Sequence, residues 1–572
     1  MAGQKTKGAP SRQDSFIFWM KVRLLRVRRS IQNARETRPK LTKLEPDQCK
    51  FPIAESVTRL WTSESEDERR LECGKVHNLR VAAKLLDGLI VPAEQTFSFW
   101  RIIGKPTKSK GFVQGRQVQE GCIIASIGGG LCQLSNSLFD VATKAGLEII
   151  ERHPHTMIVP GSAAEYGRDA TVAWNHIDLR FRAKTTIRLT AKLTADSLVV
   201  QVFADAQSSN AFVPILSQSP GSRKIANSCE TCGQEDCFRH MDQTTFETAS
   251  AWLLDSVWPE FDLYLNANKA TGDQLLTPIG RPFHVPARFQ WSDHPRTDYA
   301  NFVALQRAMK LRNVAGNGPE RRAALLHFEE CLAKSYAKKL DFSARHLSID
   351  LSLLPHLWKI GALGGREFSV LATRWPLAEI HRRFDEASLR FPDRGLLADF
   401  RAPKDIVEAE TVALGYAKSI VTPHPGIATL FGSRAVLIPW QMEKTEEPIG
   451  KDLVFLGPTI ARKGCYEVRD AVKDLGMPLW VGGREFEGQE FWNGVQKHSL
   501  KEEWLSSAGI VIAPSILEDQ PRMLLKAFAR GIPIITTRES GIPNANHVRF
   551  VEFGDADMIR GCLSEMRLRA ES

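Results

Sequence analysis

"GIVIAPSILEDQPRMLLKAFARGIPIITT" (residues 509–537) carries two strand patterns around one helix pattern. Both ends are short apolar runs rich in β-branched residues, which are typical of buried strands. Between them, residues 522–530 have apolar positions at helical spacing. Gly531 and Pro533 stand where that helix is expected to end. Buried strands that alternate with helices predict a parallel sheet covered by helices on both faces.

The same alternation continues upstream of this stretch. The runs "LVFLG" and "PLWVGG" are apolar, and "KGCYEVRDAVKDLG" has helical spacing. Further upstream, "YAKSIVTPHPGIATLFGSRAVLIPW" (residues 416–440) has the order strand, turn, helix, strand. We therefore expect two doubly wound α/β domains in tandem, at residues 245–440 and 441–572, with a ligand cleft between them.

The N-terminal half contains a different motif, "IGGGLCQLSNSLFDVATKAG" (residues 127–146). Its apolar positions recur at steps of three and four from Leu131, which predicts an amphipathic helix that Gly146 ends. Cys132 falls in the first turn, where unpaired backbone N–H groups and the helix dipole lower a thiol pKa. The three glycines permit positive φ angles and the close approach of a ligand.

A cysteine nucleophile also needs a base and an orienting acid, and two nearby segments supply them. "ERHPHT" holds His153 and His155, and "GRDATVAWNHIDLRF" holds Asp169, His176 and Asp178, which we expect on a pair of strands. We predict catalytic roles for Cys132, His153, His155 and Asp169. The alternative is that Cys132 is a small buried residue and the histidines are satisfied core residues.

A cysteine cluster, "SCETCGQEDCFRH", lies in an expected connector at residues 211–244. Its candidate ligands are Cys229, Cys232, Cys237 and His240. Four such side chains within a dozen residues match a tetrahedral structural zinc site. The spacing also fits an iron–sulfur cluster, a redox pair of thiols or a loop of free thiols.

Most of the positive charge lies at the N-terminus. Residues 1–40 hold eleven Lys and Arg and two acidic residues, which gives a net charge of +9 out of +10 for the chain. The rest is nearly neutral, so no nucleic-acid partner is expected. Within this tail (residues 1–45), "SFIFWMKVRLLRVRRSIQ" mixes apolar and basic residues, which predicts either a solvated arm or a membrane-surface helix through residues 16–29. No run of about twenty apolar residues is present.

Residues 69–203 resemble the VanW-like family, which is named after vancomycin-resistance gene clusters. The matching stretches are "NLRVAAKLLDGLIVPAEQTFSFW", "GGGLCQLSNSLFDVA", "ERHPHT" and "GRDATVAWNHIDLRF". We expect a mixed α+β VanW-like domain at residues 46–210. A cysteine at a helix start that is followed by a strand histidine is also similar to the arrangement in papain-like and transglutaminase-like hydrolases.

The C-terminal half resembles the group 1 glycosyltransferases through "FLGPTIARKG" and "IAPSILEDQPRMLLKAFARGIPIITTRESGIP". The resemblance implies the GT-B architecture, two Rossmann-like domains, and transfer with retention. It implies that Arg462 and Lys463, with Gly457, face the donor diphosphate, and that Glu518 contacts the donor sugar. The family's second glutamate, which holds the ribose, is replaced by Lys526, and a lysine cannot accept the ribose hydrogen bonds.

Together these features predict a multidomain α/β protein: a VanW-like domain, a small Cys-rich connector and a GT-B pair. The expected function is sugar transfer from a nucleotide-sugar to a cell-envelope or polysaccharide acceptor, glycan or lipid-linked. One alternative is a cysteine-dependent hydrolase or acyl transferase that acts on envelope material. Another is a glycan- or nucleotide-binding scaffold without activity. The scattered cysteines indicate a cytoplasmic location, with the tail at the inner face of the membrane.

Overall fold

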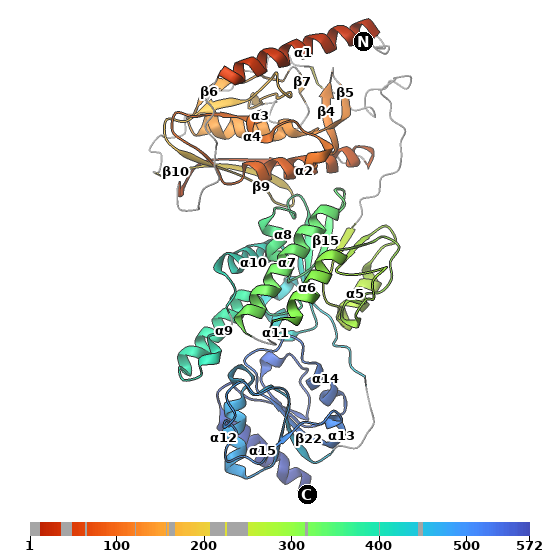
Figure 1. The fold of residues 1–572 in the computed structure, drawn as a ribbon, viewed down its shortest axis with the longest axis vertical. Helices are drawn as coiled ribbons and strands as arrows, with labels where there is room; N and C mark the ends of the chain where they lie inside the picture. The colour runs from red at the N-terminus through yellow and green to blue at the C-terminus, as the bar shows by residue number, and fades with distance from the viewer. Residues whose placement is uncertain are drawn as a thin grey trace. The chain divides into compact units, whose positions relative to one another are not determined.

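The computed structural model describes residues 12–35, 49–62, 66–119, 122–155, 157–158, 166–205, 224–225, 250–314, 318–399, 401–443 and 450–571 (Figure 1). They belong to two compact units. Unit 1 comprises Met1–Ala249, Asp341–Arg345 and Ile360–Glu367, and unit 2 comprises Ser250–Leu340, His346–Lys359 and Phe368–Ser572. No helix among the described residues has both the length and the apolar character needed to cross a membrane.

Unit 1 combines short antiparallel sheets with helices. Its helices are α1 (Arg12–Arg35), α2 (Glu66–Leu86), α3 (Phe99–Ile103) and α4 (Leu131–Lys144). One sheet has the order β1-β10-β9-β2, made of β1 (Phe51–Arg59), β10 (Ser197–Ala204), β9 (Ile187–Leu193) and β2 (Leu89–Val91). A second has the order β3-β8-β6, made of β3 (Thr96–Ser98), β8 (Arg180–Arg182) and β6 (Glu148–Glu151). Two smaller pairs are β4 (Gln114–Gln119) with β5 (Cys122–Ile127), and β7 (Met157–Ile158) with β11 (Lys224–Ile225).

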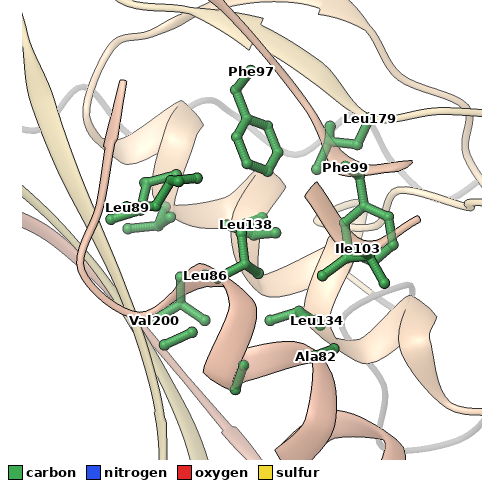
Figure 2. Packing of buried hydrophobic residues seen from close by; sticks show 14 of the residues in the cluster. Ala82, Leu86, Leu89, Phe97, Phe99, Ile103, Leu134, Leu138, Leu179 and Val200 are labelled. Atoms are coloured by element: carbon green, nitrogen blue, oxygen red, sulfur yellow. The ribbon is translucent and has the colours of Figure 1, made fainter. Parts of the chain in front are cut away.

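The core of unit 1 lies where α2 and α4 meet the four-stranded sheet. Every second residue of β10 is buried, because successive side chains of a strand point to opposite faces. Figure 2 shows Val200 of this strand beside Leu86 of α2 and Leu138 of α4. Phe97 stacks on Phe181 with ring centroids 4.5 Å apart, which joins the second sheet to the same core.

Unit 2 holds two sheets, and the first has the order β14-β13-β12-β15-β16-β17-β18. Its strands are β12 (Ser250–Leu253), β13 (Gln274–Thr277), β14 (Thr297–Tyr299), β15 (His346–Asp350), β16 (Glu367–Leu371), β17 (Ser419–Thr422) and β18 (Ala435–Leu437). Its helices are α5 (Pro259–Asn268), α6 (Asn301–Arg312), α7 (Pro319–Lys339), α8 (Leu354–Lys359), α9 (Leu377–Arg390), α10 (Lys404–Tyr416) and α11 (Pro425–Phe431). In chain order the first six strands read 3-2-1-4-5-6, which is the Rossmann order.

The second sheet of unit 2 has the order β21-β20-β19-β22-β23-β24, which is again 3-2-1-4-5-6, and its strands pair in parallel. Its strands are β19 (Asp452–Phe455), β20 (Leu479–Val481), β21 (Lys497–Ser499), β22 (Ala508–Ala513), β23 (Ile534–Thr536) and β24 (Val548–Phe550). Its helices are α12 (Cys465–Leu475), α13 (Trp504–Ser507), α14 (Arg522–Ala529) and α15 (Ala556–Glu571). The predicted doubly wound pair is confirmed by these two strand orders.

The predicted elements around Cys132 are confirmed in part. Helix α4 begins at Leu131, and Gly146, just after it, has a φ of +66°. The expected pair of strands across "GRDATVAWNHIDLRF" is wrong, because only β8 at its end is a strand and the remainder forms turns with one isolated bridge, Ala173 to Ile177. Asn175 adopts a φ of +59° in this turn, so the backbone reverses where a strand would have continued.

Candidate functional sites

The second sheet of unit 2 offers a ligand site where its winding reverses. In a 3-2-1-4-5-6 sheet this point lies beyond the carboxyl ends of strands 1 and 4, where ligands of such folds bind. Here those strands are β19 and β22. The chain that follows β19 carries Arg462 and Lys463, and the loop that follows β22 carries Glu518. The structure therefore brings three of the predicted donor-site residues to the expected edge.

Lys463 and Glu518 form an ion pair across this point. Their side chains are 21% and 25% exposed, so the pair is partly shielded but open to solvent. Gly457 makes room for it, because a Cβ there would lie 2.9 Å from Cβ of Lys463. Gly464 makes room for the backbone of the loop that follows β22. It has a φ of +77°, and a Cβ there would lie 2.5 Å from the carbonyl oxygen of Pro514. A side chain at position 464 would therefore keep the chain that follows β19 from its observed contact with the loop that follows β22.

Arg462 links the two loops through its backbone, since its carbonyl accepts a hydrogen bond from the N–H of Ile516 at 3.0 Å. Burial lowers the pKa of its guanidinium, although the charges of Asp399 and Glu518 oppose this shift. Lys526 lies in the last turn of α14 and is exposed. It places an ammonium donor where the glycosyltransferase resemblance expects a carboxylate acceptor.

A tryptophan from the domain of the first sheet contacts the loop that carries Glu518. Trp375 follows β16 and is 1% exposed. Its backbone N–H donates to Asp519 at 2.9 Å, and its indole N–H donates to the carbonyl of Glu518 at 3.2 Å. His424 adds a contact of 3.2 Å between its Nε2 and the carbonyl of Glu539. The loop that carries Glu518 is therefore held by Trp375, and the chain around Glu539 by His424, and both of these residues belong to the first sheet's domain.

The second candidate site lies at the start of α4 in unit 1. The chain enters this helix through Gly129 and Gly130, and a Cβ on Gly129 would lie 2.1 Å from the carbonyl oxygen of Gly115 in β4. Gly130 has a φ of +96°, and a Cβ there would lie 2.2 Å from Cγ of Lys75. The expectation of close approach by a ligand is thus corrected: the protein's own strand β4 and helix α2 occupy the space beside these two glycines. The result is a fixed position for Cys132, which is half-buried.

His155 and Asp169 meet beside Cys132. Nδ1 of His155 lies 2.9 Å from Oδ2 of Asp169, and the backbone N–H of His155 donates to the same oxygen at 2.6 Å. Arg152 donates to the other carboxylate oxygen at 3.0 Å. The side chain of His155 interacts electrostatically with the Cys132 thiol, whose Sγ lies 4.0 Å from the carbonyl oxygen of Val172.

These contacts shift the pKa of each member of the trio formed by Cys132, His155 and Asp169. Burial raises the pKa of the Cys132 thiol, but the hydrogen bond and the charge of His155 outweigh burial, so the net shift is downward. Burial lowers the pKa of His155, but Asp169 and Cys132 reverse this and raise it to about 9. Burial raises the pKa of Asp169, but the hydrogen bonds from His155 lower it to about 2. The arrangement favours a thiolate, an imidazolium and a carboxylate.

The other predicted histidines and acids lie apart from this trio. His153 is 49% exposed, and its Nε2 faces Glu151 at 3.3 Å. His176 bonds through Nδ1 to the carbonyl of Trp174 at 3.0 Å. Asp178 caps α3, where it accepts from Ser98 at 2.6 Å and from the backbone of Trp100 at 3.1 Å.

Two residues that the sequence analysis missed hold the Asp169 segment against α4. Ser135 donates to the carbonyl of Ala170 at 2.6 Å, and Asn136 accepts from the N–H of Ala170 at 2.8 Å. Both are buried. The signal was present in the sequence, because three polar residues follow Leu134 between apolar positions of the helix, and buried polar groups need partners.

The predicted metal ligands lie outside the described residues. Cys229, Cys232, Cys237 and His240 fall in the undescribed stretch 226–249, so the zinc and iron–sulfur alternatives stay predictions. Within the part of the chain that the structure describes, no group of three or more His, Cys, Asp or Glu side chains is placed to hold a metal ion.

Residues 74–203 match a family model described as "VanW like protein", so unit 1 contains a VanW-like domain. The vancomycin B-type resistance protein VanW of Enterococcus faecalis is 39% identical over 138 residues, which is 23% of this chain and 50% of that protein. The Bacillus subtilis protein YoaR is 35% identical over 130 residues, which is 22% of this chain and 42% of that protein. The match thus spans half or less of the length of these curated relatives.

Solved glycosyltransferases are similar to the other part of the chain. The lipopolysaccharide outer core galactosyltransferase WaaB is 13% identical with a TM-score of 0.34, over 56% of this chain and 91% of that one. Anabaena Alr3699/HepE, in complex with UDP and glucose, is 11% identical with a TM-score of 0.34, over 57% of this chain and 91% of that one. The two Rossmann strand orders of unit 2 are those of a GT-B pair in their own right.

Proposed function

We propose that unit 2 transfers a sugar from a nucleotide-sugar to a glycan or lipid-linked acceptor of the cell envelope. The observation that carries this proposal is the Lys463–Glu518 pair, with Arg462 beside it, at the reversal point of the second sheet. Cations there suit a diphosphate, and a carboxylate suits the hydroxyls of a sugar.

The chemistry of transfer gives each of these groups a role. As the bond from the anomeric carbon to the diphosphate breaks, negative charge develops on the leaving oxygen, and Arg462 and Lys463 stabilise it without reorganising. The acceptor oxygen then bonds to the anomeric carbon on the face that the diphosphate leaves, and its proton passes to the diphosphate. Glu518 holds Lys463 in place before the donor arrives and accepts hydrogen bonds from the donor sugar afterwards.

Lys526 sets the expected nucleotide preference. Without a carboxylate at this position the ribose lacks an acceptor for its hydroxyls, so recognition rests on the diphosphate and the sugar. We therefore expect weak discrimination among nucleosides that carry the same sugar.

Calorimetric titration of the full chain with a panel of UDP-, GDP- and ADP-sugars tests the proposal. We expect binding that Lys463→Ala weakens by about tenfold or more, since a charged hydrogen bond is worth about 1.5–3 kcal/mol. Lys497→Ala is the matched control, because Lys497 forms a similarly exposed ion pair with Glu485 in the same sheet's domain. Equal affinities in the two variants, or no binding by the folded wild-type chain, would contradict a donor site at Lys463.

We also propose that α1 lies on an anionic membrane surface, where a lipid-linked acceptor would be found. The apolar residues Phe16, Met20, Leu24, Val27 and Ile31 follow one another at helical steps and are 49–73% exposed. By the same helical geometry, Lys21 and Arg28 flank one side of this stripe and Arg23 flanks the other. A different face of α1 contacts the rest of unit 1, where Arg29 pairs with Glu151.

A further inference from the structure

We propose that unit 1 contains a second catalytic centre, in which Cys132 is the nucleophile of an acyl-transfer reaction, His155 its acid and base, and Asp169 the group that orients His155. This activity is separate from sugar transfer and rests on residues of unit 1 alone. Three segments supply the three groups: the start of α4, the chain after β6 and the turn before β8.

The hydrogen bonds determine which nitrogen of His155 serves the thiol. Asp169 is fully buried and receives both the backbone N–H and Nδ1 of His155. A bond from Nδ1–H to the carboxylate fixes the tautomer and the plane of the ring. It leaves Nε2 as the ring nitrogen that can exchange a proton with the Cys132 thiol, whose charge interacts with His155. This is the order of groups that an activated nucleophile requires: nucleophile, base, orienting acid.

A purely structural role does not account for these residues. Arg152 already neutralises Asp169 with an ion pair of 3.0 Å, so His155 is not needed to balance that charge. Cys132 is half-buried at the edge of the core rather than enclosed in it. Burial raises the pKa of the Cys73 thiol to about 11 and also raises that of Cys465, whereas the pKa of Cys132 is lowered.

The start of α4 supplies the remaining requirement, donors for the oxyanion. The first backbone N–H groups of a helix have no carbonyl four residues before them within the helix, and they point outward along its axis. The N–H of Gln133 donates to the carbonyl of Gly130 at 3.0 Å, so the donors that we assign to an acyl oxygen on Cys132 are the N–H groups of Leu131 and Cys132. The side chain of Gln133 is directed elsewhere, because it donates to Thr58 at 3.1 Å and to the carbonyl of Arg59 at 2.8 Å.

The reaction that fits these groups has two balanced steps. The Cys132 thiolate attacks the carbonyl carbon of an amide or ester, a C–S bond forms, and the bond to the leaving amine or alcohol breaks as His155 gives it a proton. Water or an amine then attacks the thioester and gives its proton to His155, and the thiolate leaves. The substrate class is thus a carboxylic amide or ester, and no oxidant or metal takes part.

Alkylation of the full chain by iodoacetamide over a series of pH values tests the ion pair, with each cysteine followed by peptide mass spectrometry. We expect Cys132 to react at a pH below that of an ordinary thiol, and His155→Gln to slow it by about tenfold or more near pH 6, since each pKa unit is a factor of ten. His153→Ala is the matched control and should leave the rate unchanged. Cys331, which is also half-buried and has His327 at 3.6 Å, serves as a reference within each sample.

The acyl step is tested with p-nitrophenyl acetate on the same chain. We expect a burst of about one p-nitrophenol per chain, acetylation of Cys132, and loss of both in Cys132→Ser. A wild-type Cys132 that is not alkylated, or that follows the pH profile of Cys331, would overturn the proposal without any variant. So would a reactive Cys132 that the ester does not acetylate. Neither result bears on binding of nucleotide-sugars by unit 2.

Discussion

At the scale of single residues, the contacts of His155 and Asp169 favour the charged form of both side chains. His155 is held as a cation between a carboxylate and a thiol, and Asp169 is held as an anion by two hydrogen bonds from His155 and one from Arg152. Folding raises the pKa of His155 and lowers the pKa of Asp169, as expected for groups whose charged forms gain partners in the folded state. Each shift therefore makes the stability of unit 1 depend on pH.

The pH window follows from the two shifted values. The pKa of His155 rises from an ordinary 6.5 to about 9, so its stabilisation is complete below pH 6.5 and is lost as the pH rises through about 9. The pKa of Asp169 falls to about 2, so its stabilisation holds above an ordinary 3.8 and is lost only as the pH falls through about 2. We expect His155→Gln to destabilise unit 1 most near the lower end of the histidine window, by about 1–3 kcal/mol.

Resistance of unit 1 to proteolysis in urea, measured for wild type and His155→Gln at both ends of this window, checks that expectation. The difference between the two chains should shrink above pH 9. A difference that stays constant across the window would mean that His155 acts through packing alone. His153→Ala, which removes an exposed ring, should change stability little at either pH.

At the scale of elements, α1 carries an exposed apolar stripe made of Phe16, Met20, Leu24, Val27 and Ile31. Its docked face uses Arg29 with Glu151, and the backbone of Arg26 and the hydroxyl of Ser30 with Asn175. The apolar stripe plays no part in these contacts. Exposed apolar surface flanked by basic residues is the pattern of helices that lie in a membrane interface.

Leu24→Glu places a carboxylate in the centre of that stripe. We expect it to abolish binding of the full chain to vesicles that contain anionic lipid, as measured by co-sedimentation, because it adds a charge that must be buried in the interface. Val57→Glu, at an exposed apolar residue of β1, is the matched control and should bind like wild type. Binding that survives Leu24→Glu, or that does not depend on anionic lipid, would assign the stripe of α1 to another partner.

Elements with strong periodicity could be predicted from the sequence, and elements held by side chains could not. Strands β19, β20, β22 and β23 of the second sheet were predictable because each is a short, mostly buried apolar run. Strands β21 and β24 were not predicted, because their sequences, KHS and VRF, are too polar to form such a run. The turn that carries Asp169 was not, because its path depends on Ser135 and Asn136 of a distant helix. The trio itself was predictable as residue types, but the choice of His155 over His153 required the geometry.

At the scale of the whole molecule, the contact between Trp375 and Glu518 shows why the sequence could not predict every residue around the proposed donor site. The motif around Glu518 lies in one domain, yet the carbonyl of Glu518 is bonded by an indole from the other. Nothing in the order of residues links positions 375 and 518, which are 143 apart in the chain.

The two proposed centres lie in separate compact units, so their chemistry should be separable in one chain. We expect Cys132→Ser to abolish acetylation and leave nucleotide-sugar affinity within about twofold of wild type, since distant sites without shared partners act additively. Glu518→Ala should weaken nucleotide-sugar binding and leave the acetylation of Cys132 unchanged.

Both activities are measured on the same preparations of wild type, each single variant and the double variant. If Cys132→Ser changes the nucleotide-sugar affinity, or Glu518→Ala changes the acetylation rate, by more than about twofold, the two centres are coupled. Unchanged values would mean that the two reactions are independent, because coupling requires that a change at one site alters the free energy of the other.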